Sequence, residues 1–175
     1  IILHMIKPMK FRRYIFFTHS GNFVMNFILT FLPTAVVVYI VTKGAIHLGT
    51  NLLFFAASVA FGVMINFFVD FFVGSICLFT ESIWGINIMK EVVVLLLSGA
   101  VIPISFFPES LAKVVMVLPF QAIYNTPLSL LIRHGMPLAE RFRMLGVQLI
   151  WVIVLAVATD LFWKKAVKRI TVNGG

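Results

Sequence analysis

The chain has 175 residues, of which 61% are hydrophobic and only 11% are charged. Because a soluble domain carries about 25% charged residues, this composition excludes a soluble globular protein and indicates an integral membrane protein. The formal net charge of +8 comes from lysine and arginine clusters that flank apolar runs near both ends. This is the positive-inside pattern of membrane proteins, and no polar domain is present that could bind nucleic acid.

The chain begins with a basic, amphipathic segment over residues 1–22. Such a segment is typical of the cytoplasmic membrane surface, where it either lies in the interface as an anchor or is the binding surface for another subunit. About 20 apolar residues cross a bilayer core, and the apolar runs predict four full spans. These spans cover residues 23–42, 52–79, 83–102 and 144–163, and a basic cytoplasmic tail follows over 164–175.

Between the last two spans, residues 105–132 are apolar but interrupted by prolines, which remove backbone donors and clash with the preceding helical turn. Irregular backbone is tolerated in lipid only where protein or water shields it, so the segment predicts an external re-entrant hairpin. A fifth full span over 111–132 is the alternative, which the prolines and the polar side chains of Lys113, Gln121 and Asn125 disfavour. The hairpin residues are Gly99, Pro103, Phe106, Phe107, Pro108, Pro119, Phe120 and Pro127.

The sequence therefore predicts an all-α membrane protein, a single polytopic bundle with both termini cytoplasmic. One stripe of small and polar residues recurs every four positions along its second span, at Ser58, Gly62, Asn66, Asp70 and Gly74. Small residues allow two helices to approach closely, so a helix–helix interface is the simpler interpretation. The alternative is a substrate or proton path lined by the two polar members, because carboxylates inside membranes usually face the bundle interior. Lys90, in the next span, is long enough to snorkel to the interface and needs no catalytic role.

No arrangement of residues indicates catalysis. The four histidines are scattered over separate segments, and the one cysteine, Cys77, lies in an apolar run. The sequence contains no nucleophile elbow and no glycine-rich phosphate loop. We therefore expect no catalytic, cofactor-binding or metal-binding residues in this chain, and any ATP hydrolysis must come from another subunit.

Several short motifs follow one another along the whole chain. They are Ile6-Lys7-Pro8, Leu97-Ser98-Gly99 with Pro103, Phe106-Phe107-Pro108, Leu118-Pro119-Phe120, Pro127-Leu128 and Thr171-Val172-Asn173-Gly174-Gly175. In this order and spacing they resemble the permease subunits of type-2 ABC exporters, in a bacterial family formerly of unknown function. The chain is similar to the later two thirds of such a six-span permease, so we expect it to be a fragment that carries the third to sixth spans.

The resemblance implies a role for each end of the bundle. The cytoplasmic coupling helix that docks on an ATPase subunit would include Ile6, Lys7, Pro8 and Lys10. This favours the interpretation of residues 1–22 as a surface that another subunit binds. Lys7 stands where the family pattern has arginine. Residues 105–132 would be the external re-entrant helices that cap the translocation path.

The resemblance also implies partners and a location. Two separate ATPase subunits would hold ATP and magnesium, and a second permease subunit, identical or similar, would complete a dimer in the lipid of the bacterial cytoplasmic membrane. The main alternative is an ion-coupled secondary transporter or channel that uses Asp70 and Asn66. A non-transporting membrane scaffold and a lipid-modifying enzyme are further alternatives.

Overall fold

The computed structural model describes residues 50–76, 83–133 and 135–173, together with a few isolated positions between 21 and 40. The chain divides into two compact units, Ile1–His47 and Leu48–Gly175, and every helix described below belongs to the second unit. All regular elements in these described ranges are helices, which confirms the predicted all-helical membrane fold. The predicted segment 1–22 and most of the predicted span 23–42 lie outside the described residues.

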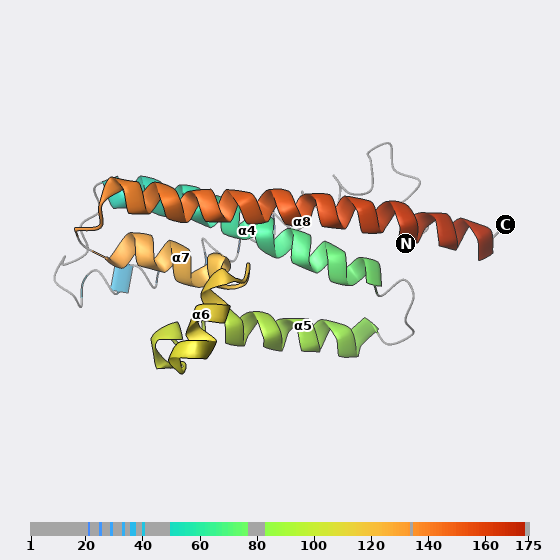
Figure 1. Cartoon of the computed structure of the whole chain (residues 1–175), viewed down its shortest axis with the longest axis horizontal. Coiled ribbons are helices and arrows are strands. Elements are labelled where there is room, and N and C mark those ends of the chain that lie inside the picture. The colour runs from blue at the N-terminus through green and yellow to red at the C-terminus, as the bar shows by residue number, and fades with distance from the viewer. Residues whose placement is uncertain are drawn as a thin grey trace. The chain divides into compact units, whose positions relative to one another are not determined.

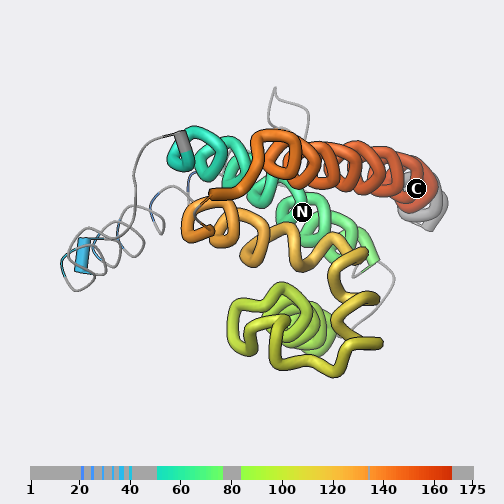
Figure 2. The backbone as a smooth tube through the Cα atoms, turned by 60° about the vertical axis from the view of Figure 1, so that its left-hand side comes forward, coloured from blue at the N-terminus to red at the C-terminus, as the bar shows by residue number. Residues whose placement is uncertain are grey.

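Two long helices, α4 (Thr50–Ile76) and α8 (Leu138–Asn173), are long and apolar enough to cross a membrane. They lie side by side (Figures 1 and 2). Near the end of α4 they pack through aromatic rings, with 5.2 Å between the ring centroids of Phe71 and Trp163. Residues 52–76 of the predicted span 52–79 lie in α4 and the predicted span 144–163 lies in α8, while residues 77–79 lie outside the described residues. Helix α8 is longer than its predicted span, because charged residues continue the helix beyond the apolar run at both ends.

Helix α5 (Ile83–Leu97) has 15 residues, which corresponds to about 22 Å and is shorter than the ~30 Å bilayer core. The span predicted over 83–102 is therefore helical only in its first part. The helix ends where Gly99 adopts a φ of +80°, a left-handed conformation that favours glycine. Pro103 then begins the short 3₁₀ helix η3 (Ile104–Phe106).

The proline-rich segment folds into two short helices, α6 (Glu109–Val117) and α7 (Gln121–Ile132), which are bent by 98° relative to each other. Such a bent pair is either a broken span or a re-entrant loop, so the described part of the chain contains two membrane-crossing helices, or three if the pair is one span. Residues 111–132 do not form one straight helix, because the chain turns at Pro119. Helix α7 lies along α4 (Figure 2).

The core of this unit lies where three helices meet. One side chain from each of α4, α7 and α8 forms the buried cluster, namely Ile65, Ala122 and Val152. Partly buried apolar side chains such as Phe61 and Ile123 pack around it. The hairpin is therefore attached to the membrane helices through α7, and the contacts at this junction determine where the hairpin sits.

Candidate functional site

A glutamine on α8 connects the three helices of the core. Gln148 is fully buried, and its Nε2 donates hydrogen bonds to the carbonyl oxygen of Ser58 on α4 at 3.1 Å and to that of Ala122 on α7 at 2.7 Å. Among the described residues, Gln148 Oε1 and Ser58 Oγ have no hydrogen-bond partner. Gln148 is not among the site residues predicted from the sequence, although a lone amide inside an apolar run is a detectable signal.

A glycine on α4 allows the backbone of α7 to approach closely. A Cβ built on Gly62 would lie 3.1 Å from the carbonyl oxygen of Ile123 and 3.5 Å from that of Ala122. The Ile123 carbonyl is special, because Pro127 lies four residues later in α7 and has no N–H to donate to it. Gly62 therefore packs against a carbonyl that the α7 helix itself leaves without its usual partner. Backbone carbonyls of α7 therefore contact both α4 and α8, in addition to the apolar side chains that α7 contributes to the core.

The predicted stripe on α4 divides into two parts. Ser58 and Gly62 are buried at the contact with α7 and α8, while Asn66 and Asp70 are partly buried farther along the helix. Gly74 is exposed, and a Cβ built there would meet nothing within 4 Å. The structure thus brings together only the first two members of the stripe at the three-helix junction.

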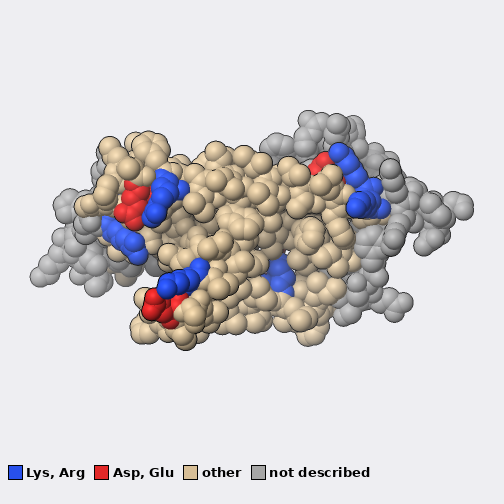
Figure 3. All heavy atoms as spheres, in the orientation of Figure 1, with Lys and Arg blue, Asp and Glu red and all other residues tan. Residues whose placement is uncertain are grey.

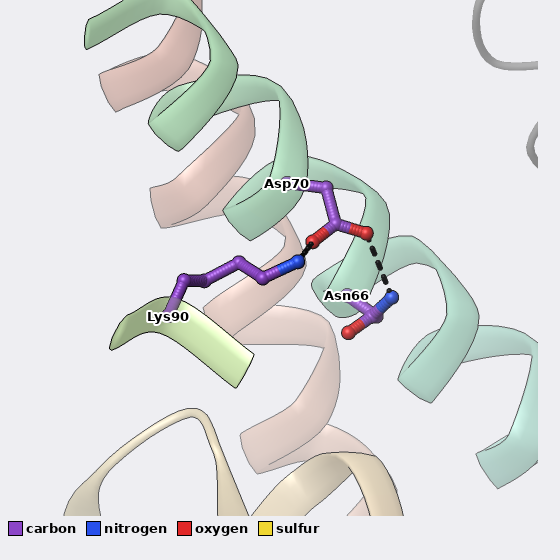
Figure 4. A network of polar contacts seen from close by, with 3 residues as sticks. All are labelled: Asn66, Asp70 and Lys90. Carbon is purple, nitrogen blue, oxygen red and sulfur yellow. Dashed lines mark hydrogen bonds and ion pairs between the residues drawn. The ribbon is translucent and has the colours of Figure 1, made fainter. Parts of the chain in front are cut away.

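The polar members of the stripe form a network with the neighbouring helix α5 (Figure 4). Lys90 Nζ lies 2.6 Å from Asp70 Oδ1, and Asn66 Nδ2 donates a hydrogen bond of 3.0 Å to Asp70 Oδ2. The side chains of Lys90 and Asp70 are only 17% and 20% exposed. Lys90 thus has a carboxylate of α4 as its partner. The pair connects α5 to α4 and neutralises both charges.

The predicted hairpin residues shape the fold and do not converge on one site. Gly99 provides the left-handed turn, and Pro103 and Pro108 occupy the positions just before η3 and α6. Pro119 is buried at the bend, and Pro127 is buried inside α7. The aromatic members differ in exposure, since Phe106 is 78% exposed whereas Phe107 and Phe120 are partly buried. The predicted coupling residues Ile6, Lys7, Pro8 and Lys10 lie outside the described residues.

A pocket that sequence reasoning missed lies between α6, α7 and the beginning of α8. Its cavity volume is about 300 Å³. Its lining residues come from three separate helices, so no local sequence pattern predicts it. They are Met116, Gln121, Asn125, Thr126, Ser129, Arg133, Glu140, Arg143, Met144 and Val147.

Charged side chains gather toward the two ends of the face shown in Figure 3, with a mostly uncharged surface between them. This distribution is expected of helices that cross a bilayer. On α8, Lys164 Nζ and Asp160 Oδ2 form an i,i+4 ion pair of 2.8 Å. Within the described ranges no group of His, Cys, Asp or Glu side chains could hold a metal ion.

Comparison with known proteins gives one finding. A protein-family model described as ABC-2 family transporter protein matches residues 3–174 of the chain. Neither a curated protein nor a solved structure matches it significantly. The match covers nearly the whole sequence, including the junction, the hairpin and the pocket.

Proposed function

Because this chain belongs to the ABC-2 transporter family and is a multi-pass membrane permease, we propose that it works as the permease subunit of an ATP-driven exporter. In this proposal the chain forms the translocation path together with a second permease subunit, and separate ATPase subunits bind ATP and magnesium. Closure of the ATPase subunits on ATP moves the cytoplasmic segment that contains Lys7 and Pro8. The membrane helices then switch the side to which the path is open, because ATP binds one conformation more tightly than the other.

The observation that carries the proposal is the family match together with the way the bent pair α6–α7 is attached. Gln148 and Gly62 hold α7 on both crossing helices through backbone contacts. Because the hairpin contacts both helices, its position changes when α4 and α8 move relative to each other. This is the mechanical connection that a cap at the external end of a translocation path requires.

The proposed partners fit the exposed surface of α5. Large apolar side chains on this helix are exposed, with Trp84 78% and Met89 71% exposed. In a bilayer such side chains contact lipid or another subunit. We assign the chain to the bacterial cytoplasmic membrane, with both ends of the sequence on the cytoplasmic side, as the positive-inside pattern favours.

The first test is to purify the complete gene product from its native membrane and identify co-purifying chains by mass spectrometry. We expect a stoichiometric ATPase with a phosphate-binding loop. The double variant Lys7→Ala/Pro8→Ala should lose this ATPase and lose transport, because the coupling segment would be disrupted. Lys165→Ala, which removes an exposed basic residue near the other end of the chain, is the matched control and should keep both. Unchanged ATPase association in the double variant would show that the coupling role is wrong.

The second candidate function is an ion-coupled transporter or channel, and Asp70 inside a membrane span is the observation that favours it. A coupling ion would have to compete with Lys90, which already contacts the carboxylate, and for this reason we prefer the exporter. The two functions differ in their energy source. Ion coupling predicts transport that follows a proton or sodium gradient and survives ATP depletion, whereas a scaffold would show neither flux nor ATPase stimulation.

A further inference from the structure

The pocket between α6, α7 and α8 has an amphiphilic lining. Its apolar part consists of Met116, Met144 and Val147, and its polar part consists of amide and hydroxyl side chains of α7. Two arginines, Arg133 and Arg143, line it as well. A volume of about 300 Å³ is at the lower end of the range of small-molecule sites, so the pocket can hold a head group and the beginning of a chain.

The polar wall of the pocket is preorganised by hydrogen bonds within α7 and from α7 to α6. Gln121 Oε1 accepts one from Thr126 Oγ1 at 2.9 Å and one from Asn125 Nδ2 at 3.3 Å, and Gln121 Nε2 donates to the carbonyl oxygen of Met116 at 3.4 Å. Gln121 and Thr126 are both buried. These side chains therefore keep their positions without a ligand, which lowers the entropic cost of binding one.

The charge of the pocket is positive. Arg133 and Arg143 face a single carboxylate, that of Glu140. Arg143 and Glu140 are 3.8 Å apart, and their side chains are 76% and 38% exposed, so this pair is long and weak. Arg133 forms no ion pair with any residue in the described ranges. Guanidinium groups bind phosphate and carboxylate in a bidentate geometry, which makes an anion the ligand that these side chains select.

From this geometry we propose that the pocket binds an amphiphile with one anionic head group, such as an alkyl phosphate. The head group contacts Arg133 and Arg143, and the beginning of the alkyl chain lies over Met116, Met144 and Val147. The inference goes beyond the proposed function, because this binding needs neither ATP nor an ATPase subunit. Binding and transport are therefore measured separately, and the failure of one does not entail the failure of the other.

The test measures the binding of radiolabelled dodecyl phosphate to the full chain in nanodiscs of zwitterionic phosphatidylcholine. We expect Arg133→Gln/Arg143→Gln to weaken binding by about tenfold or more, because two charge-assisted contacts are lost. Lys113→Gln is the matched control. It removes one positive charge, where the double variant removes two, from an exposed pair with Glu109 on α6, outside the pocket, and should change the affinity by less than about twofold.

Two further ligands separate head-group from tail recognition. Inorganic phosphate should bind much more weakly than dodecyl phosphate because it lacks the alkyl chain, and dodecyltrimethylammonium should fail to compete because it carries the opposite charge. Ser129→Leu fills the pocket without changing its charge and should also abolish binding. The proposal is overturned if the double arginine variant binds normally, if Lys113→Gln weakens binding equally, or if dodecyltrimethylammonium competes as well as dodecyl phosphate.

The same assay distinguishes the two sources of such a ligand. If phosphatidylglycerol added to the nanodisc displaces dodecyl phosphate, the site takes an anionic lipid of the bilayer. If it does not, the site takes an amphiphile that is not a bilayer lipid. Both results support an amphiphilic anion site, provided that binding still depends on Arg133 and Arg143.

Discussion

The close contact between α4 and α7 at Gly62 gives the sharpest prediction. In Gly62→Ala the new methyl group would lie 3.1 Å from the carbonyl oxygen of Ile123, closer than nine in ten real Cβ contacts. Its neighbours are backbone atoms of α7, which cannot rotate away as a flexible side chain can. Overpacking of this kind costs about 1–3 kcal/mol. The same substitution gains about 1 kcal/mol of helix propensity, because alanine is the better helix former.

A second glycine on the same helix separates these two effects. Gly74→Ala gains the same helix propensity, but nothing lies within 4 Å of the added methyl group. The difference between the two variants cancels the propensity term, so Gly62→Ala should be less stable than Gly74→Ala by about 1–3 kcal/mol. Gly146→Ala on α8, which also has open space, is a further control.

The measurement is unfolding of each purified variant by SDS in mixed micelles, with hydrogen exchange of the α7 amides as a local readout. We expect Gly62→Ala to unfold at lower SDS than both controls and to exchange faster in α7 than in the rest of the described helices. Equal unfolding of Gly62→Ala and Gly74→Ala would refute the close packing of α4 against α7.

Three further substitutions test a hydrogen bond at the junction, the ion pair between α4 and α5, and the topology of the hairpin. Gln148→Leu should lower stability by about 1 kcal/mol, since interhelical hydrogen bonds in membranes average about 0.6 kcal/mol each. Thr159→Val should cost less, because Thr159 is equally buried but bonds only within α8. Equal losses in SDS unfolding would contradict the bridging role of Gln148. Lys90→Met should cost about 1–3 kcal/mol, because it leaves the mostly buried Asp70 carboxylate without its lysine. Adding Asp70→Asn should recover much of that loss, and additive losses in the same assay would contradict this prediction. Ser129→Cys should react with a membrane-impermeant maleimide from outside the cell, and labelling only from the cytoplasm would support a full span for α6–α7 in place of an external hairpin.

The sequence was sufficient to predict the helical membrane fold and the break in the proline-rich segment. Apolar runs of spanning length predict helices directly, and Pro108 and Pro119 determine where α6 and α7 begin. The end of α5 was missed, because Gly99 acts as a helix terminator only through its left-handed conformation, and nothing in the apolar run before it indicates that conformation.

The contacts of the candidate sites were harder to predict. Asp70 and Lys90 are 20 residues apart and pair across two helices, so no helical periodicity connects them. The pocket has the same difficulty, since its lining comes from three elements. Gln148 is a different case. Its isolation in an apolar run was visible, but its two acceptors are backbone carbonyls, which have no signature in the sequence.

The attachment of α7 through peptide carbonyls has a consequence for how the protein can change over evolution. Every residue type presents a backbone carbonyl, so the acceptor for Gln148 at residue 122 and the surface opposite Gly62 at residue 123 do not depend on particular side chains, although the buried position of Ala122 limits the size of the residue there. The face of α7 that lines the pocket can then vary in size, charge and polarity while the helix keeps its position. A transporter built in this way can acquire a new ligand preference through α7 without redesigning the joint that holds it.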